Sequence, residues 1–391
     1  MPVGGAEVLL VNLMRRMDPA LVQPEVICLK EPGPLGETIA KEFPVHCHLI
    51  GGKYDLAVLP RLARLLRRRQ ADAVITVGAG DKMFWGRLAA KLAGIPVIAS
   101  ALHSTGWPDG VGRLNRWLTP MTDAFIAVAR SHGEFLRSFE RFPAGKVHVI
   151  RNGVDCQRFH PDQSARREVR SALGLADETP LIGLVAALRP EKNHSMLVHA
   201  AAKLRSKFPD LHTLIIGEGP ERQRIEGLRD QLGVEDRVHL LGNRDDTPRL
   251  LAGLDLFTLC SLNEASPVSI LEALACGTPV VATDVGSVSE TVIPNGTGRL
   301  VPSGDLSGFT EAISELLGDP EKRRVMGNAG RELVIQTGSL DAMVTGYQQL
   351  LQQTYARKQR PRRRPLPAPG TGAEASSMPR PSAKGMQAAT R

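Results

Sequence analysis

Short, almost purely apolar runs recur along the chain, and most of them are bounded by glycine, proline or aspartate. These runs cover residues 73–77, 96–100, 124–129, 147–150, 181–188, 213–217, 238–242, 254–260 and 279–283. Continuous apolarity over such lengths is typical of strands buried on both faces, as in a parallel sheet covered by helices. Segments with helical spacing lie between the runs, for example 61–69, 194–207 and 222–232. The alternation predicts a doubly wound α/β fold, which binds ligands beyond the carboxyl ends of its strands.

The number of runs is too large for one sheet of this kind, and 391 residues suit two domains of ordinary size. The turn pair Asn152-Gly153 follows the run at 147–150 and gives the best boundary between them. We therefore expect two Rossmann-like domains that face each other across a cleft. The predicted units are an acceptor-side domain at 1–157, a donor-side domain at 158–339, a returning helix at 340–356 and a tail at 357–391.

The positive charge of the chain is concentrated in this tail. Nine lysines and arginines lie there against one acidic residue, Glu374, so the net charge of the tail equals the +8 of the whole chain. The body is therefore neutral, and we expect no specific nucleic acid partner, although nucleic acid binding by the tail stays an alternative. Rich in proline and poor in apolar residues, the tail is expected to be disordered.

Cysteine usage and hydropathy predict a cytoplasmic protein. The five cysteines are scattered, without a CxxC pair or a histidine at zinc spacing; they are Cys28, Cys47, Cys156, Cys260 and Cys276. Such a set is typical of reduced thiols. We find neither a signal peptide nor an apolar run approaching ~18 residues.

One segment, 56–69, combines five arginines with five leucines at helical spacing. A basic amphipathic helix of this kind binds to an anionic membrane surface, which would place the protein at the inner face of the cell membrane. Alternatively, the leucines pack on the sheet while the arginines face water.

The amino terminus is unusual because Gly4 and Gly5 open a helix-like run at 8–17 with no strand upstream. Backbone N–H groups at such a glycine pair can bind phosphate at a helix start. A flexible terminus is the alternative. The motif normally follows a strand, so we expect either that the start codon is misplaced or that the first domain lacks a strand. We expect the genomic sequence upstream of Met1 to encode it in frame.

The strongest local pattern contains two glutamates, Glu264 and Glu272, after the run at 254–260. A helix should begin near Pro267 and end at Gly277, which puts Glu264 in the loop and Glu272 in the helix. Both carboxylates then lie at the ligand end of the sheet, where they can accept hydrogen bonds from hydroxyls at opposite ends of a sugar nucleotide. Two isolated glutamates would more often be a helix cap and a surface ion pair.

This pattern resembles the Glu-x7-Glu signature of GT-B glycosyltransferases, in the large retaining family known as glycosyl transferases group 1 (glycosyltransferase family 4-like). Other segments resemble the same family: 4–7 its glycine loop, 150–161 its interdomain segment, 190–193 its donor-phosphate loop, and 217–220, 241–246 and 255–261 its second-domain strand ends. The resemblance covers about residues 4–350.

The resemblance implies a retaining hexosyltransferase that uses a nucleotide-diphosphate (NDP) sugar as co-substrate and an unidentified acceptor, either a glycan, a lipid-linked molecule or a small molecule. It implies that Lys192 stabilises the diphosphate, Glu264 holds the sugar hydroxyls and Glu272 holds the ribose. His103, at a predicted strand end, corresponds to the active-site histidine of the family, so the catalytic set is His103, Lys192 and Glu264. The remaining donor-binding candidates are Gly4, Gly5, Arg189, Gly217, Gly242 and Asn243.

The chain departs from the family pattern at Ala187, where the family has an arginine that shares the task of the lysine. Arg189 either replaces that arginine or is a solvated surface residue. We find no metal-ligand cluster and no convincing Asp-x-Asp motif, so we expect neither a metal nor a cofactor. The alternatives are another GT-B enzyme, such as a sugar-nucleotide epimerase or a phosphorylase, and a degenerate sugar-nucleotide-binding protein without turnover.

Overall fold

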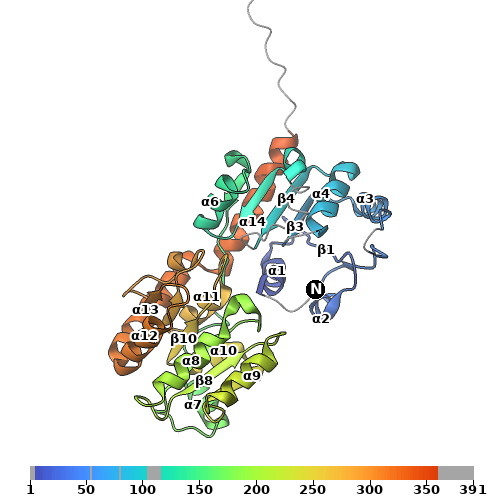
Figure 1. Ribbon diagram of the computed structural model, residues 1–391. Coiled ribbons are helices and arrows are strands. Elements are labelled where there is room, and N and C mark those ends of the chain that lie inside the picture. The colour runs from blue at the N-terminus through green and yellow to red at the C-terminus, as the bar shows by residue number, and fades with distance from the viewer. Residues whose placement is uncertain (1–4, 53–54, 79–80, 104–115, 360–391) are drawn as a thin grey trace, which may run out of the picture.

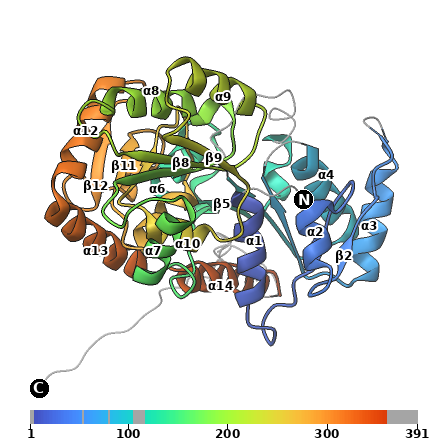
Figure 2. The same ribbon diagram turned by 90° about the horizontal axis from the view of Figure 1, so that it is seen from below.

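The computed structural model describes residues 5–52, 55–78, 81–103 and 116–359 (Figure 1). Two α/β domains lie side by side, and a long C-terminal helix runs along the first of them (Figures 1 and 2). Three predicted features lie outside the described residues: Gly4, the strand expected before it, and the tail from residue 360 to 391.

The second domain is built on a parallel sheet with the strand order β12-β11-β10-β7-β8-β9. Its strands are β7 (Leu181–Val185), β8 (His212–Ile216), β9 (Val238–Gly242), β10 (Leu256–Leu259), β11 (Val280–Thr283) and β12 (Gly298–Val301). Each of these strands except β12 coincides with a predicted apolar run, and their residues are largely buried, as strands covered on both faces should be.

The strand order of this sheet changes direction between its two central strands. From β7 the chain adds β8 and then β9 on one side, and it then crosses to β10 and adds β11 and β12 on the other side. The loops that leave the carboxyl ends of β7 and β10 therefore turn away from each other. Open α/β sheets bind ligands at such a switch point.

Helices cover both faces of this sheet. They are α7 (Gln163–Ala172), α8 (His194–Leu204), α9 (Arg222–Gln231), α10 (Thr247–Gly253), α11 (Val268–Ala275), α12 (Leu306–Gly318) and α13 (Pro320–Thr337). One apolar core joins α8, α9 and α12 to the sheet through residues such as Leu197, Ile225 and Phe309. The opposite core joins α7, α10 and α11 to the sheet, with Leu251 and Leu274 at its centre.

The first domain contains a parallel sheet of order β3-β4-β5-β6 and a separate pair, β1-β2. Its strands are β1 (Val26–Ile27), β2 (Val45–His46), β3 (Ala73–Val77), β4 (Val97–Leu102), β5 (Ala124–Ala127) and β6 (Val147–Val149). Its α-helices include α1 (Gly5–Arg16), α2 (Gly33–Ile39), α3 (Val58–Arg68), α4 (Asp81–Ala93) and α6 (Arg130–Ser138). The described residues also form four short 3-10 turns: η1 (Thr119–Met121), η2 (Ala144–Lys146), η3 (Pro190–Lys192) and η4 (Val288–Glu290).

Helix α3 decides between the two interpretations of the arginine- and leucine-rich segment. Leu62 and Leu66 are buried against α4 and β4, so the apolar face of the helix packs inside the domain. Arg64 and Arg68 are exposed on the opposite face. Because its apolar face is already occupied, α3 does not offer that face to a lipid surface. None of the helices in the described part of the chain combines the length and apolarity needed to cross a bilayer.

The last helix, α14 (Leu340–Gln359), belongs to the core of the first domain. Met343 and Tyr347 pack with Leu13 of α1 and Ala99 of β4. The described part of the helix reaches Gln359, three residues beyond the predicted end at 356. Its last turn contains Lys358, whose ammonium lies 2.7 Å from the Asp123 carboxylate, and a cation there interacts favourably with the helix dipole.

Three strands carry no clear pattern in the sequence. Strands β1 and β2 are two residues long, too short to form an apolar run. Strand β12 begins with Gly298-Arg299 and lies at an edge of its sheet, and these two residues interrupt the apolar pattern by which a strand is predicted. The tertiary structure explains this glycine, because a Cβ at position 298 would lie 2.0 Å from the carbonyl oxygen of Val280 in β11.

Candidate active site

Lys192 lies in the loop after β7, at the switch point of the second sheet. The loop is fastened to the end of β10: the Leu262 N–H donates to the Glu191 carbonyl at 2.8 Å, and the Cys260 thiol donates to the Asn193 carbonyl at 3.1 Å. Asn193 ends the η3 turn in the left-handed conformation (φ 51°), which asparagine tolerates better than most residues. The backbone of the Lys192 loop is thus held to the neighbouring strand.

A second loop, after β8, supports the Lys192 loop from the other side. A Cβ at Gly217 would lie 2.1 Å from the carbonyl oxygen of Ala186, and one at Gly219 would lie 2.4 Å from that of Leu188. Glycine is therefore required at both positions for the close approach of the two backbones. Gly242, at the end of β9, has a positive φ of 70°, a conformation that favours glycine.

Glu264 follows β10 and meets Lys192 across the switch point. Its Oε1 atom accepts hydrogen bonds from Lys192 Nζ at 2.6 Å and from Ser261 Oγ at 2.7 Å. The Glu264 side chain is 7% exposed and that of Lys192 is 22% exposed. A carboxylate this deeply buried needs a partner, and the ammonium supplies the compensating charge.

The Lys192 ammonium has hydrogen-bonding capacity left. It has three donor hydrogens and gives one to Glu264, and no other hydrogen bond of this ammonium is found within the described segments, so two hydrogens can be donated to a ligand. His194, one residue beyond the loop, does not add positive charge: burial, with a smaller contribution from Lys192, lowers the pKa of its imidazole to about 4.

Glu272 has a different environment, although it lies only one helix turn and a half from the loop. The structure confirms the predicted helix, since α11 begins at Val268 and Gly277 follows its end with a φ of 75°. Burial raises the pKa of the Glu272 carboxyl to about 7, and Arg158 only partly offsets this. No side-chain hydrogen bond or ion pair of Glu272 is found within the described part of the chain.

The remaining candidates have different surroundings. Arg189 is exposed, and its nearest acidic neighbour is Glu191 at 4.0 Å. Asn243 is exposed in the loop after β9, and Gly5 is the exposed first residue of α1. His103 is half-buried directly after β4, in the other domain. The structure therefore brings together Lys192 and Glu264, with Ser261 as a partner.

Several residues at the junction of the domains escaped the sequence analysis. Asn152 Nδ2 donates to the Ser266 carbonyl at 3.1 Å, and the Glu290 carboxylate accepts from the backbone N–H groups of Arg130 and Ser131 at 3.0 and 2.7 Å. Only Asn152 had a signal in the sequence, as part of a turn pair. Nothing local in the sequence identifies Glu290, because its partners are about 160 residues away. Groups of three or more metal-ligating side chains are not found in the described segments.

Comparison with known proteins identifies the family. The family profile "Glycosyl transferases group 1" matches residues 165–333, and the profile "Glycosyltransferase Family 4" matches residues 3–158. A Mycolicibacterium smegmatis protein named GDP-mannose-dependent alpha-(1-6)-phosphatidylinositol monomannoside mannosyltransferase is 31% identical over 288 residues, which are 70% of this chain and 74% of that protein. A Bacillus anthracis protein named N-acetyl-alpha-D-glucosaminyl L-malate synthase is 29% identical over 302 residues, 75% of this chain and 78% of that protein.

Among solved structures, Anabaena HepE in complex with UDP superposes with a TM-score of 0.78 at 22% identity, over 90% of this chain and 96% of that chain. This likeness shows the fold. The two parallel-sheet domains thus define a GT-B protein. The chain belongs to the glycosyl transferases group 1 family and is a glycosyltransferase.

Proposed function

We propose that this glycosyltransferase transfers a hexose-type sugar from an NDP-sugar to an acceptor, with retention of anomeric configuration and without a metal ion. The observation that carries the proposal is the Lys192–Glu264 pair at the switch point of the second sheet. The name of the Mycolicibacterium smegmatis relative includes GDP-mannose, and this supports a nucleotide-linked sugar here. The acceptor is a glycan, a lipid-linked molecule or a small molecule.

In this proposal Lys192 stabilises the leaving group. Negative charge on the diphosphate grows as the glycosidic bond breaks, and an ammonium with two remaining donor hydrogens can bind the phosphate oxygens. The same ammonium neutralises Glu264, which would otherwise repel the diphosphate. Lys192 thus supplies the charge that a divalent ion supplies in other transferases.

The two glutamates would hold the ends of the donor. Glu264 accepts hydrogen bonds from hydroxyls of the transferred sugar, and its Oε1 is fixed by Lys192 and Ser261. Glu272 accepts from the ribose, because no partner of its carboxylate is found among the described residues that the ribose would have to displace. Glycine positions 217 and 242, with Asn243, line the neighbouring strand ends.

The first domain would bind the acceptor and complete the site through His103. The acceptor hydroxyl attacks the sugar from the side of the leaving group, and a phosphate oxygen takes its proton. Gly5, at the start of α1, is proposed to donate its backbone N–H group to the phosphates together with Gly4, which lies outside the described residues. The protein is proposed to act in the cytoplasm. The exposed arginines of α3 and the basic tail would attract it to an anionic membrane face.

A donor screen tests the proposal. UDP-, GDP- and ADP-sugars are offered to the full chain, ligand binding is measured by thermal shift, and NDP release is followed with and without acceptor extracts. We expect one donor class to raise the melting temperature and to release NDP. Binding without any NDP release would instead indicate a degenerate sugar-nucleotide-binding protein, and release of sugar 1-phosphate would indicate a phosphorylase.

Two single substitutions separate Lys192 from Arg189. Lys192→Ala should lower kcat by roughly 10²–10³-fold, the effect typical of losing one charge-stabilising group. Arg189→Ala should lower it by less than about tenfold, because the side chain is 61% exposed and lies apart from the Lys192–Glu264 pair. Circular dichroism controls for folding, since the first variant leaves Glu264 without its cation. Equal losses in the two variants would show that Arg189 replaces the missing arginine at 187.

A further inference from the structure

The loop that carries Glu264 is held by the segment after β11. The Ser287 hydroxyl donates to the carbonyl oxygen of Ala265 at 2.5 Å, and Ser287 is buried. Gly286 lies so close that a Cβ at this position would be 1.6 Å from the carbonyl oxygen of Glu264. The backbone at Glu264 and Ala265 is therefore held by residues 286–287.

The same segment ends in a carboxylate that reaches the first domain. Glu290, at the end of η4, accepts through Oε1 from the Ser131 N–H and hydroxyl, each at 2.7 Å, and through Oε2 from the Arg130 N–H at 3.0 Å. Arg151 Nη2 lies 3.6 Å from Oε2. Arg130 and Ser131 are the first two residues of α6, so a carboxylate of one domain caps a helix of the other.

The loop that carries Glu264 has a second contact with the first domain. Asn152, in the connection between the domains, donates to the carbonyl of Ser266 at 3.1 Å and is 4% exposed. The cavity between these groups has a volume of about 20 Å³, room for about one water molecule. Residues 264–266 are thus anchored to the first domain by Asn152 and, through Ser287, by Glu290.

The charge balance favours this arrangement of the domains. Burial acts to raise the pKa of Glu290, but the hydrogen bonds from Ser131 and Arg130 and the charge of Arg151 lower it overall. An ionised carboxylate that is 19% exposed is therefore held by donors from the first domain and the connection. If the domains move apart, it loses these donors together.

We propose that Glu290 is a positioning residue that couples the arrangement of the two domains to the placement of Glu264 in the donor site. The inference rests on the proposed function of Glu264 as the ligand of the transferred sugar. When α6 docks on Glu290, the segment 286–290 fixes the Glu264 loop. When α6 leaves, that loop loses its anchor, and the site is no longer assembled.

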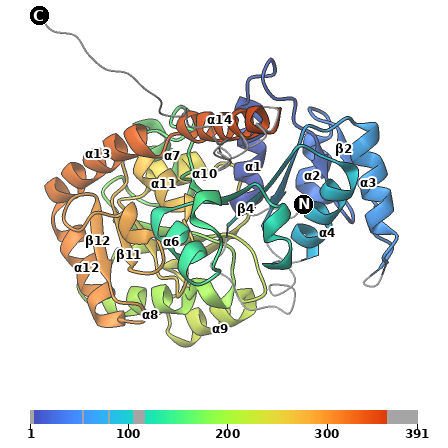
Figure 3. The same ribbon diagram turned by 90° about the horizontal axis from the view of Figure 1, so that it is seen from above.

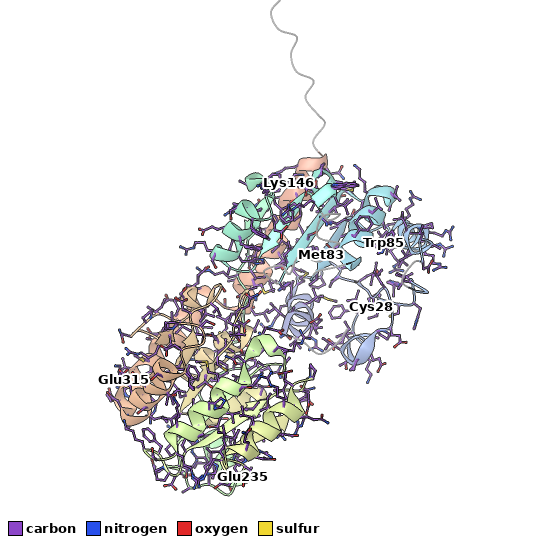
Figure 4. All side chains as sticks on the ribbon, viewed as in Figure 1. Cys28, Met83, Trp85, Lys146, Glu235 and Glu315 are labelled. Carbon is purple, nitrogen blue, oxygen red and sulfur yellow. The ribbon has the colours of Figure 1, made fainter. Side chains whose placement is uncertain are left out.

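The test compares Glu290→Ala and Glu290→Gln with Glu315→Ala. Glu315 pairs with Lys322 and Arg299 at 2.5 and 2.8 Å, and Figure 4 shows it on the part of the second domain remote from the first. This control therefore removes a carboxylate with a comparable set of partners within one domain. Arg130 and Ser131 begin α6, the helix labelled in Figures 1 and 3, and their contact with Glu290 places them where the first domain meets the second.

We expect Glu290→Ala to lower kcat by about 10–100-fold, the range for a misplaced catalytic group, with little change in NDP affinity. We expect nucleotide affinity to be retained because Glu272 lies on α11, outside the segment 286–290. Glu290→Gln keeps a carbonyl acceptor and should recover part of kcat, while Glu315→Ala should keep all of it. Amide hydrogen exchange should accelerate in Glu290→Ala at both 130–133 and 262–268.

Faster exchange at 130–133 alone would show that Glu290 merely caps α6 and would overturn the coupling. So would a wild-type kcat in Glu290→Ala. If the wild-type protein releases no NDP from any donor, the proposed function fails, but the exchange pattern still decides whether Glu290 anchors the loop. Acceleration at both segments then supports the coupling independently of turnover.

Discussion

At the scale of single residues, two glutamates of one motif have opposite electrostatic situations. Glu264 shares one oxygen between an ammonium and a hydroxyl. Glu272 is partly buried in the same domain, no such partner of its side chain is found among the described residues, and burial raises its pKa to about 7. A buried carboxylate without a cation lowers the stability of the ligand-free protein, but it can accept hydrogen bonds from the hydroxyls of a ligand. Such a carboxylate is typical of a binding site rather than of a structural ion pair.

Replacement of Glu272 by glutamine tests this difference through pH. The folded pKa lies above the ordinary value of 4.5, so the unfolded chain releases the proton first as pH rises. Stability is therefore lost between about pH 4.5 and 7 in the wild type but not in Glu272→Gln. We expect the variant to be more stable than the wild type at pH 8, by on the order of 1–3 kcal/mol, and about equal at pH 4.5. Urea unfolding at the two pH values measures this.

The exposed Glu332 on α13 provides the control, since Glu332→Gln should leave the pH dependence unchanged. The same Glu272→Gln variant should bind an NDP-sugar more weakly at pH 8, because a neutral amide replaces a charge-assisted acceptor. A variant that is less stable than the wild type at pH 8 and binds the donor normally would contradict both the raised pKa and the ribose role.

At the scale of elements, the site depends on how loops from different strands fit against one another. Glycines of the loop after β8 pack directly against the backbone of the Lys192 loop, and Gly286, in the loop after β11, packs directly against the backbone of the Glu264 loop. These contacts are between backbones, so a single added methyl group is enough to displace a loop. Strand ends define where the loops begin, while the glycines define how closely the loops approach.

Substituting Gly286 by alanine should therefore damage the site more than its conformation alone explains. Gly286 has a φ of 58°, and Gly304 has a φ of 80°, so alanine is strained at both positions, by roughly 1–2 kcal/mol. Only at 286 does the new Cβ collide with a carbonyl oxygen, that of Glu264. We expect Gly286→Ala to lose most donor turnover, while the matched control Gly304→Ala loses only stability. Melting temperature and NDP release measure the two effects, and equal turnover in both variants would contradict the prediction.

At the scale of the whole molecule, the first and last described helices, α1 and α14, share one core. Helix α14 follows the second domain in sequence, yet Tyr347 is buried with Leu13 of α1 and Ala101 of β4. The first domain therefore depends on a segment more than 300 residues away in sequence from α1. Val154 and Ser339 form an isolated parallel β-bridge, which joins the two chain segments that connect the domains.

Replacing Tyr347 by alanine should destabilise the domain farther away in sequence. Removing a buried aromatic side chain typically costs about 3–5 kcal/mol. We expect faster hydrogen exchange in β4 and α1 of Tyr347→Ala and unchanged exchange in β8. A chain ending at Gln359 is the control and should keep the wild-type melting temperature. Faster exchange in β8 with β4 unchanged would show that α14 stabilises the second domain instead.

Strong local patterns explain why much of the fold could be predicted. The apolar runs located strands such as β3 and β9 with correct bounds, because strands buried on both faces contain little else than apolar residues. The motif placed Glu264 in a loop and Glu272 in α11. Strand β12 and the last three residues of α14 were missed, since an edge strand and a basic helix end have weak patterns. The roles of His103, Arg189 and the glycine pair stay predictions.

The sequence by itself determined the alternation of strands and helices, the two parallel sheets and the family, because these depend on neighbours along the chain and on motifs a few residues long. The tertiary structure alone decided that Lys192 neutralises Glu264, that Glu290 caps α6 and that α14 completes the first core. Each of these is a contact between residues about 70 to more than 300 positions apart. Their proximity follows from strand order and domain arrangement, which no local pattern specifies.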